Sequence, residues 1–253
     1  MTAAVLIVFM TGAIVGSFLN VCVARIPGGR SIVRPGSMCP RCRAPIRFYD
    51  NIPLLSQAIL RGKCRRCGGR ISVRYAAVEI LGGLAAAAVF LRFGPSVPGI
   101  VYFAFISALI VIAFIDAAHF IIPDSITIPG IFAGLGASLV LPDLTLWDSV
   151  TGAGAGGGVL FAVAWSYKKI SGIEGIGGGD IKLLAMIGAF AGWQGALFCL
   201  FSGSTAGTLA GLAVMAKGKK GMKTPIPFGP FLAMGAIFYV FFGAVILRAF
   251  FDV

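Results

Sequence analysis

The stretch VYFAFISALIVIAFIDAAHF, residues 101–120, decides the fold class of this chain. It contains one carboxylate, Asp116, and no Lys or Arg. An apolar run of about 20 residues has the length that a helix needs to cross a hydrocarbon core of about 30 Å. We therefore expect a transmembrane helix here, with Asp116 near one of its ends.

The rest of the chain has the same character, because 58% of its 253 residues are hydrophobic, 12% are charged and the mean hydropathy is +0.96. These values exclude an ordinary soluble domain. Long continuous apolar runs favour helices over a membrane barrel. We predict an all-α polytopic membrane protein with about eight transmembrane helices, at residues 3–24, 76–92, 99–118, 124–141, 149–167, 181–194, 196–216 and 228–250.

Three features of this division are predictions in their own right. The sixth and seventh spans are separated only by a Gly-Trp-Gln-Gly turn at 192–195. The first span lacks a basic leading region and a small-residue cleavage site, so we interpret it as retained. The chain divides into a first helix at 1–24, a polar insert at 25–75 and a helical core at 76–253.

Lys and Arg gather between the predicted spans. Residues 25–74, 168–182 and 217–223 together hold 19 of the 21 basic residues, and eight spans place all three segments on one side. The positive-inside rule makes that side the cytoplasm. Basic loops beside anionic lipid account for the net charge of +12, so no nucleic-acid partner is needed.

The polar insert contains two Cys-x-x-Cys pairs, separated by twenty-one residues: Cys39, Cys42, Cys64 and Cys67. Four thiolates on two such knuckles are typical of a closed, structural Zn²⁺ site, which predicts a small zinc-ribbon-like domain. A metal supplies folding free energy that an insert of this size cannot obtain from its own core. Two disulfides or a redox pair are the alternatives, and a reducing cytoplasm opposes disulfides.

Two aspartates meet at one membrane face in the eight-span arrangement. Asp116 ends the third span on the cytoplasmic side, and Asp180, in GIEGIGGGDIKLL at 172–184, begins the sixth span on the same side. Two carboxyls that share a site cannot both ionise easily, so one holds a proton while the other activates water. The preceding glycines allow close approach of the backbone and unusual dihedral angles.

Each acid also has a structural interpretation. Asp180 can cap the sixth helix while Lys182 reaches the lipid headgroups. Asp124 follows a proline at a predicted helix start, where capping is the favoured role. Glu79, one turn into the second span, can pair with Arg74 or another cation.

The combined motifs resemble those of the bacterial prepilin peptidases, the type IV leader peptidases of the GxGD aspartic protease group. The resemblance extends over almost the whole chain and is carried by GSFLNVCVARIP at 16–27, YDNIPLLSQAILRGKCRRCGGRISVRYAAVE at 49–79, FIDAAHFIIPDSITIP at 114–129 and GIEGIGGGDIKLLAMIGAFAGW at 172–193. Ala118 and Ala76 replace residues common in that family, and neither position is an implied catalytic one.

The resemblance implies a bifunctional enzyme of the bacterial inner membrane. Such an enzyme cleaves the basic leader of type IV prepilins or type II secretion pseudopilins at the cytoplasmic face, and then methylates the new amino terminus with S-adenosylmethionine. The implied catalytic residues are Asp116 and Asp180, the implied motif glycines are Gly177 and Gly179, and the implied metal ligands are the four cysteines of the insert.

Charge complementarity gives three acids as candidates to receive the basic leader: Glu79, Glu174 and Asp124. Two other functions stay open at this point. One is a peptidase without methyl transfer, and the other is a small proton-coupled transporter with intramembrane acids as coupling sites. The oligomeric state is not set by the sequence.

Overall fold

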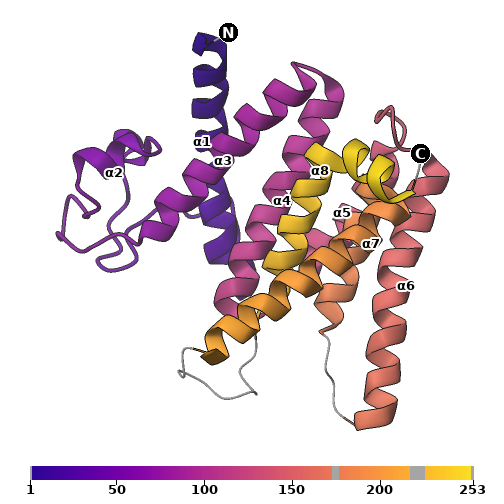
Figure 1. Ribbon diagram of the computed structural model, residues 1–253. Helices are drawn as coiled ribbons and strands as arrows, with labels where there is room; N and C mark the ends of the chain where they lie inside the picture. The colour runs from indigo at the N-terminus through magenta and orange to yellow at the C-terminus, as the bar shows by residue number, and fades with distance from the viewer. Residues whose placement is uncertain (1, 173–176, 217–225, 252–253) are drawn as a thin grey trace. The chain divides into compact units, whose positions relative to one another are not determined.

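The computed structural model describes residues 2–172, 177–216 and 226–251, and within them the secondary structure is helical with two isolated β-bridges and no strand. Helix boundaries follow the predicted apolar runs. In chain order the α-helices are α1 (Thr2–Arg25), α2 (Leu55–Ile59), α3 (Val73–Phe93), α4 (Val97–His119), α5 (Asp124–Ala137), α6 (Leu146–Ser171), α7 (Gly178–Ala216) and α8 (Gly229–Phe251), and short 3₁₀ turns occupy Ile26–Gly28 and Phe48–Asn51 (Figure 1).

Five of the described helices, α1, α3, α4, α7 and α8, are long and apolar enough to cross a membrane. α5 has 14 residues and is only about 21 Å long, which is shorter than a hydrocarbon core of about 30 Å. α6 has 26 residues, but glycines and polar side chains dominate its first half. The described helices thus establish a polytopic membrane protein with five candidate spans.

The junction predicted between the sixth and seventh spans is a kink inside α7. The helix has 39 residues and leaves helical dihedrals only at Gly192, where φ is 71° and ψ is 178°. Glycine adopts such angles without a Cβ clash. Two helices therefore meet at Gly192, within the predicted Gly-Trp-Gln-Gly junction, and residues 193–195 are helical.

Two compact units divide the chain, Met1–Val111 and Ile112–Val253. In the first unit α1 packs along α3 through glycines. A Cβ on Gly12 would lie 2.5 Å from the carbonyl oxygen of Gly82, and one on Gly16 would lie 2.8 Å from the Cα of Glu79. Small residues let membrane helices approach until their backbones touch, so a larger side chain here would separate α1 from α3.

In the second unit α7 packs against α5, α6 and α8. Its contact with α6 also rests on glycine, since a Cβ on Gly188 would lie 2.0 Å from the carbonyl oxygen of Gly152. The small-residue segment 151–158 therefore forms a helix crossing. The start of α7 and the last turns of α4 belong to this same unit.

The polar insert between α1 and α3 begins and ends with clear local signals. After Arg25 the chain turns through an Ile-Pro-Gly 3₁₀ turn whose following residue, Gly29, has φ 62°. At the other end the hydroxyl of Ser72 accepts the N–H of Arg74 at 3.3 Å and caps α3. The residues between these two points hold all four cysteines of the predicted metal site.

Candidate active site and metal centre

Asp116 lies in the last turn of α4, where it is only 5% exposed. Its Oδ2 accepts the backbone N–H of Gly229 at 2.8 Å. Gly229 is the first residue of α8, so the carboxylate faces the N-terminal end of a helix, where free N–H groups and the helix dipole favour negative charge. A Cβ at Gly229 would lie 2.8 Å from Oδ2, so a larger residue there would displace the carboxylate from this N–H group.

Asp180 lies in the first turn of α7 and is half-buried. The backbone N–H of Gly177 hydrogen-bonds its carboxylate, and its charge interacts with that of Asp116. The structure therefore brings together two carboxylates that are 64 residues apart in the sequence. Each is held by a backbone N–H group, which leaves the remaining oxygens for a reacting group.

Gly177 and Gly179 allow close contacts because they lack a side chain. Neither Gly177 nor Gly179 has a positive φ, so the expectation of unusual dihedral angles is wrong for both. A Cβ on Gly179 would lie 2.8 Å from the Cβ of Ile122, and one on Gly177 would lie 3.2 Å from Oδ2 of Asp180. Gly179 thus lets the start of α7 approach the segment that follows α4.

Asp124 and Lys182 form an ion pair at 2.6 Å beside this site. The N-cap position of α5 is Pro123, and no side chain caps the helix there, so the capping interpretation of Asp124 is wrong. The ammonium group of Lys182 pairs with Asp124 and is partly exposed. The pair links the first turn of α5 to the first turn of α7, two residues after Asp180.

The four insert cysteines form one cluster, with their sulfur atoms all within 4.8 Å of one another. The two knuckles repeat the same bonds: the N–H of Cys39 donates to Ala44 at 2.9 Å, and the N–H of Cys64 donates to Gly69 at 2.8 Å. All six cysteines of the chain are free thiols. Four sulfurs at this spacing fit tetrahedral Zn²⁺, which would hold the knuckles together as a structural ion.

Backbone N–H groups affect the pKa values of the two thiols in the second knuckle, Cys64 and Cys67. Those of Cys67 and Arg66 lower the pKa of the Cys64 thiol to about 6. The N–H of Gly69 favours the Cys67 thiolate, but desolvation and hydrogen bonds with the neighbouring thiols outweigh it and raise the pKa of Cys67 to about 11. The Cys64 thiolate therefore forms readily, whereas the Cys67 thiolate is disfavoured. A bound divalent cation would stabilise both thiolates.

Arg65, within the second knuckle, anchors the middle of the insert. Its guanidinium donates three hydrogen bonds to the Asp50 carboxylate, two from Nε and one from Nη2, and lies 5.7 Å from the centre of the Tyr49 ring. This hydrogen-bonded guanidinium holds the pKa of Asp50 below its usual value. The pair ties the 3₁₀ turn Phe48–Asn51 to the metal cluster.

Comparison with known proteins gives the family. Residues 103–212 match the type IV leader peptidase family, and residues 10–93 match the bacterial peptidase A24 N-terminal domain. The chain is 37% identical over 257 residues to a prepilin leader peptidase/N-methyltransferase of Burkholderia pseudomallei (strain 1026b), covering 92% of this chain and 83% of the relative. The chain belongs to the type IV leader peptidase family.

Two further relatives carry the same name. The chain is 42% identical over 217 residues to a protein of the same name from Myxococcus xanthus (strain DK1622), covering 85% of this chain and 65% of the relative. It is 35% identical over 266 residues to another from Aeromonas hydrophila, covering 96% and 92%. No solved structure matches the chain. In this leader peptidase family member both aspartates lie in the peptidase match, and the four cysteines lie in the N-terminal match.

Glu79 lies apart from the aspartate pair, in the Met1–Val111 unit, and is 6% exposed. Its carboxylate accepts the N–H of Leu54 at 2.9 Å, the amide of Gln57 at 3.3 Å and the hydroxyl of Ser17. Within the described residues no ion pair joins Glu79 to Arg74 or to another cation, so the predicted pairing is wrong, and Arg74 lies over the Tyr75 ring. Glu174 and the basic run at 217–223 lie outside the described residues.

The sequence did not predict the contacts that fix the two aspartates. Gly229 at the start of α8 and Ile122 before α5 hold Asp116 and Gly179 in place. The one available signal was the Phe-Gly-Pro-Phe stretch at 228–231, since proline in a first turn marks a helix start. Nothing in that stretch indicates which side chain the new helix end will meet.

Proposed function

We propose that this chain is a membrane aspartic peptidase that cleaves the leader of type IV prepilins or type II secretion pseudopilins and then methylates the new amino terminus. The observation that carries the proposal is the pairing of Asp116 with Asp180 in one unit, at the ends of two apolar helices. The names of the relatives, prepilin leader peptidase/N-methyltransferase, support both activities.

The chemistry follows from two carboxyls that share one proton. The ionised carboxylate takes a proton from water as the water oxygen attacks the scissile carbonyl carbon, and the protonated carboxyl donates to the carbonyl oxygen. Collapse of the tetrahedral intermediate breaks the C–N bond, and the leaving amine takes up a proton. We assign Asp116 and Asp180 to these roles and Gly177 and Gly179 to the close approach of α7.

The freed amine is the substrate of the second reaction. Bound S-adenosylmethionine would give its methyl group to this nitrogen and leave as the neutral thioether, while the amine would lose a proton to water. S-adenosylmethionine supplies an activated methyl group, and the chain must hold that donor in reach of the amine.

We further propose eight spans in the inner membrane, with the insert at 25–75 and the aspartates on the cytoplasmic side. The kink at Gly192 and the basic segments at 25–74, 168–182 and 217–223 support this arrangement. The four cysteines would hold structural zinc. Among the acids predicted to meet the leader, Asp124 is exposed and Glu79 is buried, so we assign leader contact to Asp124.

A single incubation tests the proposal. Purified protein is mixed with a prepilin peptide and S-adenosylmethionine labelled in its methyl group, and both cleavage and label in the mature peptide are measured. Cleavage with incorporation supports the full proposal. Cleavage alone leaves a peptidase without methyl transfer, and the absence of cleavage contradicts the proposal.

A further inference from the structure

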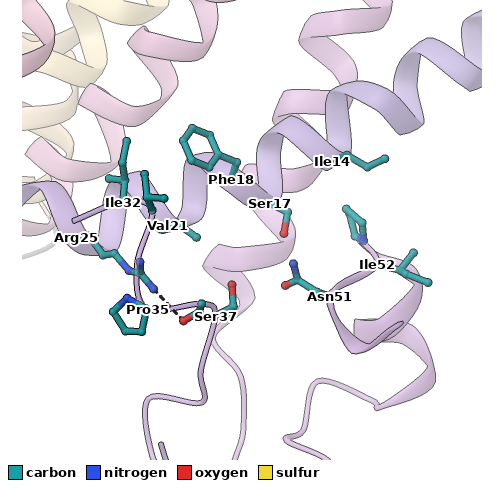
Figure 2. A pocket seen from close by; sticks show the side chains of 13 residues that line it. Ile14, Ser17, Phe18, Val21, Arg25, Ile32, Pro35, Ser37, Asn51 and Ile52 are labelled. Atoms are coloured by element: carbon teal, nitrogen blue, oxygen red, sulfur yellow. Dashed lines mark hydrogen bonds between the residues drawn. The ribbon is translucent and has the colours of Figure 1, made fainter. Parts of the chain in front are cut away.

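Two adjoining cavities lie in the Met1–Val111 unit, where the end of α1 meets the insert. The larger cavity, of about 470 Å³, has α1 on one side and residues 32–37 and 51–53 of the insert on the other (Figure 2). The smaller cavity has a volume of about 330 Å³. Arg25 and Pro35 belong to both walls, so a single ligand can occupy the two cavities together.

The larger cavity follows α1 along one face of the helix. Its helical wall runs from Ile14 to Arg25 through residues at spacings of three and four. Figure 2 shows Arg25 and Pro35 at one end of this space and Ile14 and Ile52 at the other. The step from Ile14 to Arg25 covers about 16 Å along the axis, close to half of a hydrocarbon core of about 30 Å. Because α1 is a candidate membrane span and ends at Arg25, this wall has the length of one lipid leaflet.

The insert side of the larger cavity presents apolar side chains that protein does not cover. Ile32, Val33 and Ile52 line it and are 37%, 77% and 39% exposed. Large apolar side chains gathered at one place are unfavourable in water and mark a surface that another apolar group covers. An acyl chain lying along α1 would cover both walls of this cavity.

The smaller cavity carries three guanidinium groups, from Arg25, Arg30 and Arg34. Backbone carbonyls hold two of them in place: Arg25 donates to two carbonyl oxygens of the loop 31–36 at 3.0 and 3.1 Å, and Arg30 donates to that of Ala24 at 2.8 Å. Both keep further N–H donors, and the planar guanidinium matches the oxygens of a phosphate. Among the described residues that line the two cavities none is acidic, so the site favours an anion over a cation.

We propose that the two cavities together bind one anionic phospholipid, with its phosphate among Arg25, Arg30 and Arg34 and one acyl chain along α1. The charged wall and the apolar wall meet at Arg25, in the way that phosphate and acyl chain meet in a lipid. A soluble phosphate ester would leave the apolar wall uncovered. A prepilin would bring its basic leader towards three arginines, which repel it. The bound lipid would link the insert to α1, and this role does not depend on the proposed peptidase activity.

Native mass spectrometry of the full-length protein, delipidated in detergent, measures the binding of dioleoyl phosphatidylglycerol as the probe. The double variant Arg30→Gln, Arg34→Gln should weaken binding at least about tenfold, because two of the three cations around the phosphate are lost. Val21→Trp should also weaken it about tenfold, because the indole fills the space of the acyl chain.

Each variant has a matched control. The double variant Arg66→Gln, Arg70→Gln makes the same change in charge at two exposed arginines of the insert that line neither cavity. Ile7→Trp adds an indole to α1 at a residue that is 67% exposed and outside both walls. Circular dichroism and a single elution peak show which variants are folded. Arg30 and Arg34 are exposed, so their double variant decides the test even if Val21→Trp does not fold.

The outcomes distinguish one lipid site from other occupants. Weaker binding in both cavity variants, with wild-type affinity in both controls and about tenfold weaker binding of dioleoyl phosphatidylcholine, supports the proposal. Wild-type affinity in either folded cavity variant, or equal affinity for the two lipids, overturns it, because the lipid contact would then be nonspecific. Glycerol 3-phosphate that competes with the lipid at equal concentration makes this a site for a soluble phosphate ester, and a prepilin peptide that displaces the lipid makes it a substrate site. Either of these two results also overturns the proposal, and neither cleavage nor methyl transfer enters the measurement.

Discussion

At the scale of single residues, the two aspartates are held in different ways. Asp116 is buried and accepts the N–H of Gly229, whereas Asp180 is half-buried and is held by the N–H of Gly177. An asparagine carbonyl can accept either N–H group, so the amide variants should keep these contacts. Their effect on activity then reports chemistry and not folding.

We expect Asp116→Asn and Asp180→Asn each to abolish prepilin cleavage, because an amide can neither activate water nor carry the shared proton. Asp124→Asn should lower cleavage by no more than about fivefold, since an exposed ion pair, whether with Lys182 or with the basic leader, contributes about 1 kcal/mol or less. The measurement is peptide cleavage at matched expression. Robust activity in Asp116→Asn with none in Asp124→Asn would mean that Asp180 has a different partner.

Gly179 gives a second prediction at this scale. Gly179→Ala should lower cleavage by about tenfold to a hundredfold, because its Cβ would lie 2.8 Å from that of Ile122 and displace Asp180 from its partner. Gly178→Ala is the control, since a Cβ there has nothing within 4 Å. The measurement is the cleavage rate of each variant. Equal rates would show that the contact of Gly179 with Ile122 does not position Asp180.

At the scale of helices, α6 and α7 pack closely because glycines lie at their contact. We expect Gly152→Ala to reduce the free energy of unfolding by about 1–3 kcal/mol, because a Cβ would lie 2.2 Å from the carbonyl oxygen of Gly188. Gly154→Ala, on the same helix, should instead raise it by up to about 1 kcal/mol, because a Cβ there has nothing within 4 Å and alanine is a better helix former than glycine. Denaturant unfolding in detergent measures both. A similar loss in the free energy of unfolding of both variants would mean that the effect comes from α6 itself and not from its contact with α7.

The insert gives a prediction on metal content. We expect about one equivalent of zinc in the purified protein and its loss in the double variant Cys39→Ser, Cys42→Ser, with Cys22→Ala as the control outside the cluster. The insert lies in the Met1–Val111 unit and both aspartates lie in Ile112–Val253, so metal loss should reduce methyl transfer more than cleavage. Metal analysis and the two activity assays check this. Unchanged zinc in the double variant, or equal loss of both activities in a folded protein, would contradict it.

At the scale of the whole molecule, the number of crossings decides which loops share a side. If α5 and α6 cross and α7 crosses twice around Gly192, residue 143 lies outside and the basic run at 217–223 lies in the cytoplasm. If only the five candidate spans cross, both positions reverse. As a straight helix of 39 residues, α7 would be about 58 Å long, which is far more than one crossing needs. This length favours the arrangement with eight spans.

Alkaline phosphatase fusions test this arrangement, because the enzyme is active only outside the cytoplasm. We expect activity for a fusion after residue 143 and none for fusions after residue 43 or residue 219. The fusion after residue 43 is the reference, since both arrangements place the insert inside. The reverse pattern at 143 and 219 would reduce the count to five.

The sequence by itself determined the class of fold, the metal cluster and the family. Apolar runs of about 20 residues leave a backbone few options other than a helix in lipid, so most helix boundaries followed from composition. The spacing of Cys39, Cys42, Cys64 and Cys67 likewise predicted one cluster, because short Cys-x-x-Cys knuckles bring their sulfurs together locally. The motifs around Asp116 and Asp180 predicted the family, which the comparisons confirm.

Only the tertiary structure decided what those residues touch. The interpretation of Asp124 as a cap and of Glu79 as a partner of Arg74 failed, because both carboxylates found partners far away in the sequence, Lys182 and the Leu54 N–H. Gly229 reaches Asp116 across 113 residues. Local patterns set helix ends, but the partner of a polar group at a helix end depends on which helices pack side by side. In this chain that packing rests on glycine contacts such as Gly152 with Gly188, whose pairing no local pattern encodes.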